Sequence, residues 1–109
     1  MSSPGEKSEP HYDLDDVKLC CATGELDIPR RVRRYMGRQE WVDADLAACI
    51  ATLRASDFHK SQKHSDRPGV WLDIYRPRFE GSRRYLKLTV RECGRGYVVL
   101  SFCRDGQAH

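Results

Sequence analysis

Two stretches near the end of the chain decide the fold: RYLKLTVR from Arg84 to Arg91, and YVVLSFC from Tyr97 to Cys103. Apolar and polar residues alternate in both, which is typical of β-strands with one buried face. The segment CGRG between them predicts a hairpin connection. The side chains expected to face the core are Leu86, Leu88 and Val90 on the first strand and Val98, Leu100 and Phe102 on the second.

The apolar residues of both strands stand at even-numbered positions, and this predicts the register of the hairpin. A hairpin centred on the glycine-rich turn pairs Val90 with Val98 and Leu88 with Leu100, so both apolar sets share one face. A slip of one residue would break this agreement. The opposite, polar face then carries Tyr85, Lys87, Thr89 and Arg91.

More β-structure is expected upstream of the hairpin. The segment VWLDIYRPRF, from Val70 to Phe79, is rich in β-forming residues, and Pro77 limits its end to an edge or a bulge. The polar segment from Ser56 to Ser65 is expected to be irregular or a short edge strand.

The N-terminal half has helical periodicity instead. Asp13 is expected to cap a helix over residues 14–23, and Pro29 suits the first turn of a short helix over residues 29–37. A third helix is capped by Asp43 and carries one apolar stripe. The stripe consists of Val42, Leu46, Cys49, Ile50 and Leu53. The predicted fold class is therefore α+β, with N-terminal helices packed on a C-terminal antiparallel β-sheet.

The chain has 109 residues, enough for one hydrophobic core and no second domain. Residues 1–10 are small, polar and proline-containing, and we expect them to form a mobile tail, leaving residues 11–109 as a single domain. Hydrophobic residues make up 39% and charged residues 32%, which excludes wholesale disorder. No signal peptide is visible and the apolar runs are too short to span a bilayer, so a cytoplasmic protein is expected.

The residues that commonly bind metals or attack substrates do not form recognisable motifs. The five cysteines are odd in number and lack a CxxC pair, which argues against a disulfide framework and for a reducing compartment. No histidine lies at ligand spacing from a cysteine or acidic residue, so we expect no metal or other cofactor. There is also no G-x-S-x-G elbow and no glycine-rich phosphate loop.

Positive charge is concentrated although the net charge is only +3. Arginines dominate residues 30–38 and 76–95, and the polar face of the hairpin combines a tyrosine with lysine and arginine. Tyrosine stacks on bases and the cations neutralise phosphate, so these features suit nucleic-acid binding. The alternative is a solvated basic surface without a partner, because an antiparallel sheet often exposes one polar face.

Residues 56–90 resemble the MqsR (motility quorum-sensing regulator) family of bacterial toxins. The matching segments read SDFHKS from Ser56, WLDIYRPR from Trp71 and YLKLTV from Tyr85, in the family's order and at its intervals. The strand VVLSF from Val98 resembles the family's last strand, and the likeness extends over roughly residues 11–104. It implies a RelE-like fold and a type II toxin that cleaves mRNA at short GC-containing sites without the ribosome. It also implies a cognate antitoxin protein, encoded nearby, that binds and silences the toxin.

The resemblance carries over residue by residue. It assigns active-site roles to Lys60 and Tyr85, whereas Leu72 stands where the family has a glutamine. Cys103 stands where the family has a basic residue, and Arg104 follows one place later.

We expect the 2′-OH of the RNA to attack the adjacent phosphorus without a metal ion. Lys60 and Arg76 would hold the phosphate, and Tyr85 would hold the substrate or share in proton transfer. His59 and His64 are alternative acids or bases, and both also suit ordinary surface positions. The expected RNA-binding residues are Arg30, Arg31, Arg33, Arg34, Lys87 and Arg91. The rival hypothesis is a non-catalytic module that uses the basic surface to bind RNA, DNA or an acidic protein.

Overall fold

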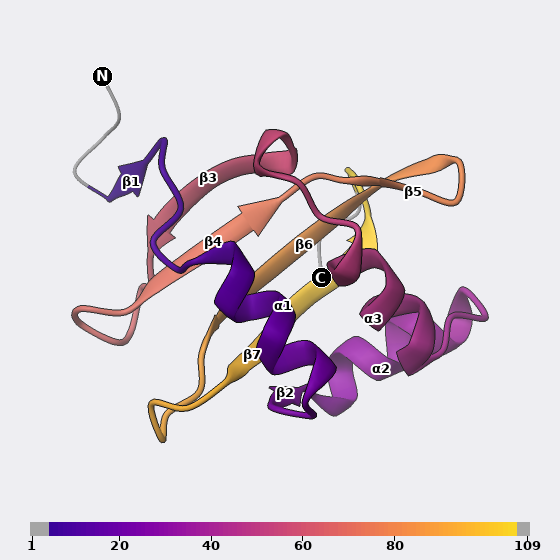
Figure 1. Ribbon diagram of the computed structural model, residues 1–109, viewed down its shortest axis with the longest axis horizontal. Helices are drawn as coiled ribbons and strands as arrows, with labels where there is room; N and C mark the ends of the chain where they lie inside the picture. Colours follow the sequence, from indigo (N-terminus) through magenta and orange to yellow (C-terminus); the bar gives the residue numbers. More distant parts are fainter. Residues whose placement is uncertain (1–4, 107–109) are drawn as a thin grey trace.

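The computed structural model describes residues 5–106. This part of the chain forms an α+β fold, which confirms the predicted class (Figure 1). The helices are α1 (Leu14–Ala22), α2 (Arg30–Arg38) and α3 (Asp43–Ala51), followed by a short 3-10 helix, η1 (Ala55–Asp57). The strands are β1 (Glu6–Lys7), β2 (Leu26–Asp27), β3 (Phe58–Lys63), β4 (Trp71–Tyr75), β5 (Arg78–Phe79), β6 (Ser82–Val90) and β7 (Tyr97–Arg104).

The sheet is antiparallel as predicted, apart from one parallel pair at its edge. The strand order is β1-β3-β4-β6-β7-β2, and β5 pairs with the beginning of β6. The parallel pair is β2 with β7. It forms where the chain leaving α1 lies along the start of β7, and there the N–H of Tyr97 donates to the carbonyl of Glu25. A strand of two residues has no detectable periodicity, so the sequence did not predict β2.

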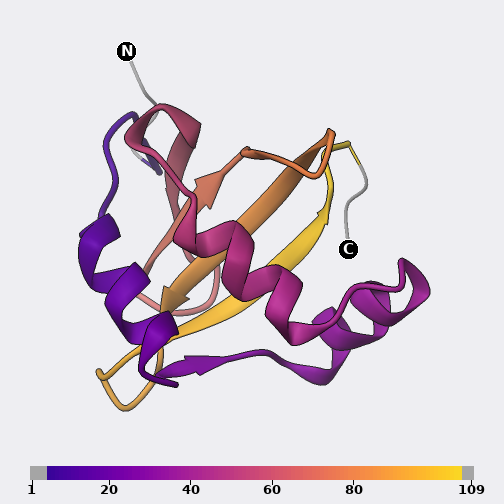
Figure 2. The same cartoon turned by 45° about the vertical axis from the view of Figure 1, so that its right-hand side comes forward.

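The helices lie on one face of the sheet and form a second layer (Figures 1 and 2). Helix α2 packs against β7, and α1 packs against α3 and β7. The core fills the space between the two layers. Its buried side chains are Val17, Val32, Met36, Leu46, Cys49, Ile50, Leu53, Tyr75, Leu86, Leu88, Tyr97, Val99 and Phe102.

The β6–β7 hairpin contains a β-bulge that the predicted register lacks. Leu88 faces Val99 and Lys87 faces Ser101, which leaves Leu100 as an extra residue on β7. An extra residue shifts the pairing beyond it by one position and reverses which side chains face the core. The pairings of Leu88 with Leu100 and of Val90 with Val98 were therefore wrong predictions.

Because of the bulge, the residues of β7 that face the core differ from those predicted. Tyr97 and Val99 enter the core, whereas Val98 and Leu100 are only half-buried. Phe102 lies on the other side of the bulge and faces the core as predicted. On β6, Thr89 is buried, and its hydroxyl donates to the carbonyl of Trp71 rather than facing solvent.

The three predicted helices are present, with small differences at their ends. Asp13 caps α1, where its carboxylate accepts the N–H of Asp15 at 3.1 Å. Helix α3 is capped differently from the prediction: Val42 is the N-cap, and its N–H donates to Asp45. Val42 is 62% exposed and does not belong to the apolar stripe, whereas the other four stripe residues are buried.

The predicted mobile tail contains ordered structure within the described residues. Glu6 and Lys7 form β1, which pairs with Gln62 and Ser61 of β3. The segment expected to be irregular or a short edge strand is thus a strand of six residues with neighbours on both sides. Residues 1–4 of the predicted tail and residues 107–109 of the predicted domain lie outside the described residues.

A buried carboxylate attaches the start of α1 to the sheet. Asp73 on β4 is fully buried and accepts the N–H groups of His11 and Tyr12 at 2.9–3.0 Å. The Tyr12 hydroxyl then donates to the carbonyl of Trp71. These bonds satisfy a carboxylate that would be costly to bury alone, and they fix the first helix over the core.

Candidate functional site

A row of directly paired residues crosses the sheet on the face opposite the helices. Lys60 on β3 faces Ile74 on β4, Ile74 faces Lys87 on β6, and Lys87 faces Ser101 on β7. Directly paired residues share a face of the sheet, and Ile74 is buried without belonging to the helix-covered core. We call this side of the sheet the outer face.

A second row on the outer face continues the site. Tyr85 on β6 faces Cys103 on β7. Arg76 follows β4 one place beyond its last pair with β6, Tyr75 with Leu86, which brings it to the level of Tyr85. The structure therefore brings together Lys60, Arg76, Tyr85 and Lys87, four of the residues that were proposed from the sequence.

The floor of the outer face is apolar and closed to water. Ile74 and Cys103 are 0% exposed, and Leu72 is 8% exposed. Burial raises the pKa of the Cys103 thiol to about 11, so this group remains protonated at neutral pH. Lys60, Tyr85 and Lys87 are half-buried around this floor. Their charges and hydroxyl therefore lie beside a low-dielectric surface, where electrostatic interactions are stronger than in water.

The electrostatics of the site follow from this arrangement. Burial lowers the pKa of Lys87, and the nearby positive charges of Lys60 and Arg31 lower it further. Burial raises the pKa of Tyr85, although the charge of Lys60 opposes that shift. The Tyr85 hydroxyl consequently keeps its proton at neutral pH and is suited to donate it.

Two of the cations have carboxylate partners. The ammonium of Lys60 lies 2.6 Å from a carboxylate oxygen of Glu6, which comes from β1. The guanidinium of Arg76 lies 2.5 Å from a carboxylate oxygen of Asp105 and donates to it. This hydrogen bond lowers the pKa of Asp105. Sequence reasoning missed Glu6 and Asp105, because neither belongs to a motif and both are distant in the chain from their partners.

Arg31 is the α2 arginine that reaches this side of the molecule. Its guanidinium donates to the carbonyl of Leu100, the extra residue of the bulge, at 2.8 Å. The bulge therefore provides the acceptor that holds Arg31 near Lys87. The sequence predicted Arg31 as an RNA-binding residue but contained no signal for this contact.

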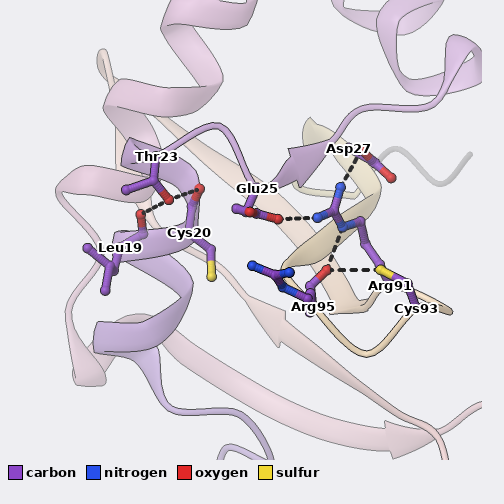
Figure 3. A network of polar contacts seen from close by, with 8 residues as sticks. All are labelled: Leu19, Cys20, Thr23, Glu25, Asp27, Arg91, Cys93 and Arg95. Atoms are coloured by element: carbon purple, nitrogen blue, oxygen red, sulfur yellow. Dashed lines mark hydrogen bonds and ion pairs between the residues drawn. The ribbon is translucent and has the colours of Figure 1, made fainter.

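Apart from Arg31 and Lys87, the predicted RNA-binding residues lie elsewhere. Arg33 is ion-paired with Asp43 at 2.8 Å, and Arg30 and Arg34 are exposed on α2. Arg91 lies at the glycine-rich end of the hairpin, where it forms ion pairs with Glu25 and Asp27 (Figure 3).

The network around Arg91 is structural in character. Its Nε also donates to the carbonyl of Arg95, so the guanidinium connects β2 to the hairpin turn (Figure 3). Helix α1 ends nearby, where the Thr23 hydroxyl donates to the carbonyls of Leu19 and Cys20 (Figure 3). The structure does not bring Arg91 together with Lys60 and Tyr85.

Arg104 does not replace the basic residue that the family has at position 103. Its Nε donates to the side chain of Gln39, and its guanidinium lies 5.5 Å from the ring centroid of Trp41. These partners belong to the segment from α2 to α3, so the side chain lies on the helix side of the sheet. Arg31 is instead the additional cation near Lys87.

His59 and His64, the alternative acids or bases, offer little to this site. His59 is exposed within an irregularity of β3, and the Nδ1 of His64 accepts the N–H of Asp66. Within residues 5–106, no three His, Cys, Asp or Glu side chains gather into a group that could hold a metal ion. All five cysteines are described, and none forms a disulfide. No helix in the same range is both long and apolar enough to cross a membrane.

Comparison with known proteins shows which family the chain belongs to. Residues 9–104 match the family described as "Motility quorum-sensing regulator, toxin of MqsA". The chain belongs to the MqsR toxin family. A curated relative, "mRNA interferase toxin MqsR" of Escherichia coli (strain K12), is 33% identical over 88 residues, which cover 78% of this chain and 87% of the relative. The matched range contains Lys60, Arg76, Tyr85 and Lys87, whereas Glu6 lies before its first residue.

Proposed function

We propose that this MqsR-family toxin is an endoribonuclease that cuts mRNA at short GC-containing sites, independently of the ribosome and of metal ions. The observation that carries the proposal is the grouping of Lys60, Tyr85 and Lys87 on an open sheet face of a chain whose relative is named an mRNA interferase. Two lysines and a tyrosine around an apolar floor suit a phosphodiester with its adjoining base.

The proposed reaction is an in-line attack within the RNA. The 2′-oxygen of one nucleotide bonds to the adjacent phosphorus, and the bond from phosphorus to the 5′-oxygen of the next nucleotide breaks. A base accepts the proton of the 2′-hydroxyl, and an acid protonates the departing 5′-oxygen. The products are a 2′,3′-cyclic phosphate and a free 5′-hydroxyl. The protein supplies no nucleophile, which suits a site without an activated serine or thiolate.

The residues of the outer face suit two of these tasks, the neutralisation of developing charge and the supply of a proton. Lys60 and Arg76 would neutralise the charge that develops on the phosphate oxygens. Tyr85 would donate a hydrogen bond or a proton, because its raised pKa keeps the hydroxyl protonated at neutral pH. Lys87 would bind a neighbouring phosphate, and Arg31 would extend the positive surface beyond the edge of β7.

We also propose a cognate antitoxin protein as the partner of this toxin, in the cytoplasm. The family description names such a partner for its members. The exposed Arg30 and Arg34 on α2 are suited either to an acidic antitoxin surface or to the RNA backbone. We assign them to RNA, because α2 also carries Arg31, which reaches toward Lys87.

The test is incubation of the purified protein with single-stranded RNAs of varied sequence in the presence of EDTA. We expect cleavage with cut ends that share a short GC-containing motif and carry a 2′,3′-cyclic phosphate. Expression without the antitoxin should arrest growth. Intact RNA in the presence of folded protein would contradict the proposed activity and favour a binding module without catalysis.

A further inference from the structure

Glu6 forms an ion pair with Lys60, the residue whose ammonium group the proposed function assigns to the RNA phosphate. Its carboxylate lies 2.6 Å from the Nζ of Lys60, and both side chains are partly accessible, at 37% and 36% exposed. The two residues are 54 positions apart in the chain. The contact therefore depends on the pairing of β1 with β3.

Strand β1 is a weak attachment to the sheet. It contributes two residues, paired with Gln62 and Ser61, and one further bond joins the Lys63 N–H to the carbonyl of Gly5. Short edge segments with few buried contacts open at low free-energy cost. The position of Glu6 over Lys60 is thus a state that the protein can leave without unfolding.

We propose that the Glu6 carboxylate competes with the substrate for Lys60. Glu6 neutralises the charge of Lys60 until an RNA phosphate displaces the carboxylate. This inference rests on the proposed function and adds a means of regulation to the same site. A carboxylate in contact with the ammonium cancels its charge and repels an approaching phosphate. RNA binding must therefore separate the Glu6–Lys60 pair, and any factor that moves β1 away from β3 raises activity.

Strand β1 is also held by contacts of Lys7, and these contacts do not involve the charge of Glu6. The Lys7 ammonium lies 4.0 Å from the ring centroid of Trp71 and 2.7 Å from the Nδ1 of His11. Replacement of Glu6 by glutamine leaves these contacts and the backbone pairing of β1 in place. The substitution Glu6→Gln therefore removes the competing charge and keeps the strand.

The matched control is Glu9→Gln. Glu9 is exposed, lies three positions along the chain and forms no hydrogen bond or ion pair with another residue in the described range. The two variants have the same net charge and differ only in whether the lost carboxylate touched Lys60. Thermal melting of both variants verifies that the fold is retained.

The experiment measures cleavage of RNA and, separately, binding of an uncleavable 2′-O-methyl oligonucleotide over a range of salt concentrations. We expect Glu6→Gln to raise kcat/KM and affinity about two- to fivefold, the range open to an exposed ion pair. The gain in affinity should shrink as the salt concentration rises, because salt screens the exposed ion pair that RNA must break in the wild type. Glu9→Gln should match the wild type in both assays.

A double-mutant cycle with Lys60→Gln tests whether Glu6 acts through Lys60. We expect the effect of Glu6→Gln on binding to shrink in the Lys60→Gln background, because there is no longer an ion pair that RNA must break. Equal effects of Glu6→Gln and Glu9→Gln, or a loss of affinity in Glu6→Gln, would overturn the inference. Binding of the uncleavable oligonucleotide decides this even if no variant cuts RNA, in which case the proposed function fails by itself.

Discussion

Lys60 and Tyr85 lie on the outer face, and neither side chain is part of the helix-covered core. Within the described residues, the Tyr85 hydroxyl has no hydrogen-bond partner, and the Lys60 ammonium contacts only a partly exposed carboxylate. Their substitution should therefore leave the free energy of unfolding within about 1 kcal/mol of the wild type. This separates a catalytic role from a structural one.

We expect Lys60→Ala to raise the activation free energy of cleavage by about 2–4 kcal/mol, because one positioned charge no longer stabilises the transition state. Tyr85→Phe should also reduce cleavage, because it removes the hydroxyl and keeps the ring. The measurements are kcat/KM with RNA and thermal melting for each variant. Full activity of Lys60→Ala would refute its role, and a large melting shift in Tyr85→Phe would show that the hydroxyl is structural.

Lys87 should give RNA binding a distinctive dependence on pH. Its pKa is lowered by burial and by the charges of Lys60 and Arg31, so it loses its proton at a lower pH than an ordinary lysine. Affinity for a 2′-O-methyl oligonucleotide should be highest below this lowered pKa, where Lys87 is protonated, and should fall as pH rises through it. Lys87→Arg should move the loss to higher pH, because arginine stays protonated.

Fluorescence anisotropy across the alkaline range tests this expectation. Lys18→Arg on α1 is the control and should leave the profile unchanged, because α1 lies on the helix side of the sheet. An identical alkaline loss in wild type and Lys87→Arg would show that another group is responsible.

The hairpin depends on one glycine for its connection to β2. Gly96 has a φ of +72°, and an added Cβ would lie 2.3 Å from the backbone oxygen of Glu25. That oxygen accepts the N–H of Tyr97, so the clash cannot be relieved without breaking the β2–β7 pair. Gly94, with a φ of +81°, has open space around the corresponding position.

We therefore expect a large difference between two similar substitutions. Gly94→Ala should cost about 1 kcal/mol, the value for the left-handed backbone alone. Gly96→Ala should cost about 3 kcal/mol, because a steric clash with the backbone adds to the same strain. Urea unfolding of both variants measures the free energies, and equal values would show that the turn can rearrange away from Glu25.

Helix α2 tests whether the RNA path extends beyond the sheet. Arg30 and Arg34 are one turn apart and exposed, whereas Arg33 is held by Asp43. Replacing Arg30 and Arg34 together by glutamine should reduce the logarithmic salt slope of binding by about 1.4, which corresponds to two phosphate contacts on a single strand. Arg33→Gln should change it less. An unchanged slope in the double variant would remove this helix from the RNA site and leave it to the antitoxin.

The two faces of the sheet differ in the side chains that they carry. The helix side forms the core, and the outer face holds Lys60, Lys87 and Tyr85. Titration with a 2′-O-methyl oligonucleotide should therefore perturb backbone amide signals of β3, β4 and β6 and leave those of α3 unchanged. Perturbations concentrated on α3 would place the RNA on the wrong side of the sheet for the proposed chemistry.

Prediction from the sequence succeeded where the signal is local. The three helices and the strands β4, β6 and β7 were expected because the spacing of apolar residues directly reflects which side of an element is buried. The grouping of Lys60 and Tyr85 followed from the family resemblance. Strands of two residues, β1 and β2, escaped prediction, because they contain no full period and form only where a longer strand offers free backbone groups.

The amino-acid sequence was enough to predict the α+β class, the family and the alternation that places Tyr85 and Lys87 away from the core. The folded chain was needed to find the bulge at Leu100, the ion pair of Glu6 with Lys60 and the ion pairs of Arg91 with Glu25 and Asp27. The physical reason is that these features join residues whose separation in the chain carries no pattern. Backbone pairing and charge bring them together only after the sheet has formed.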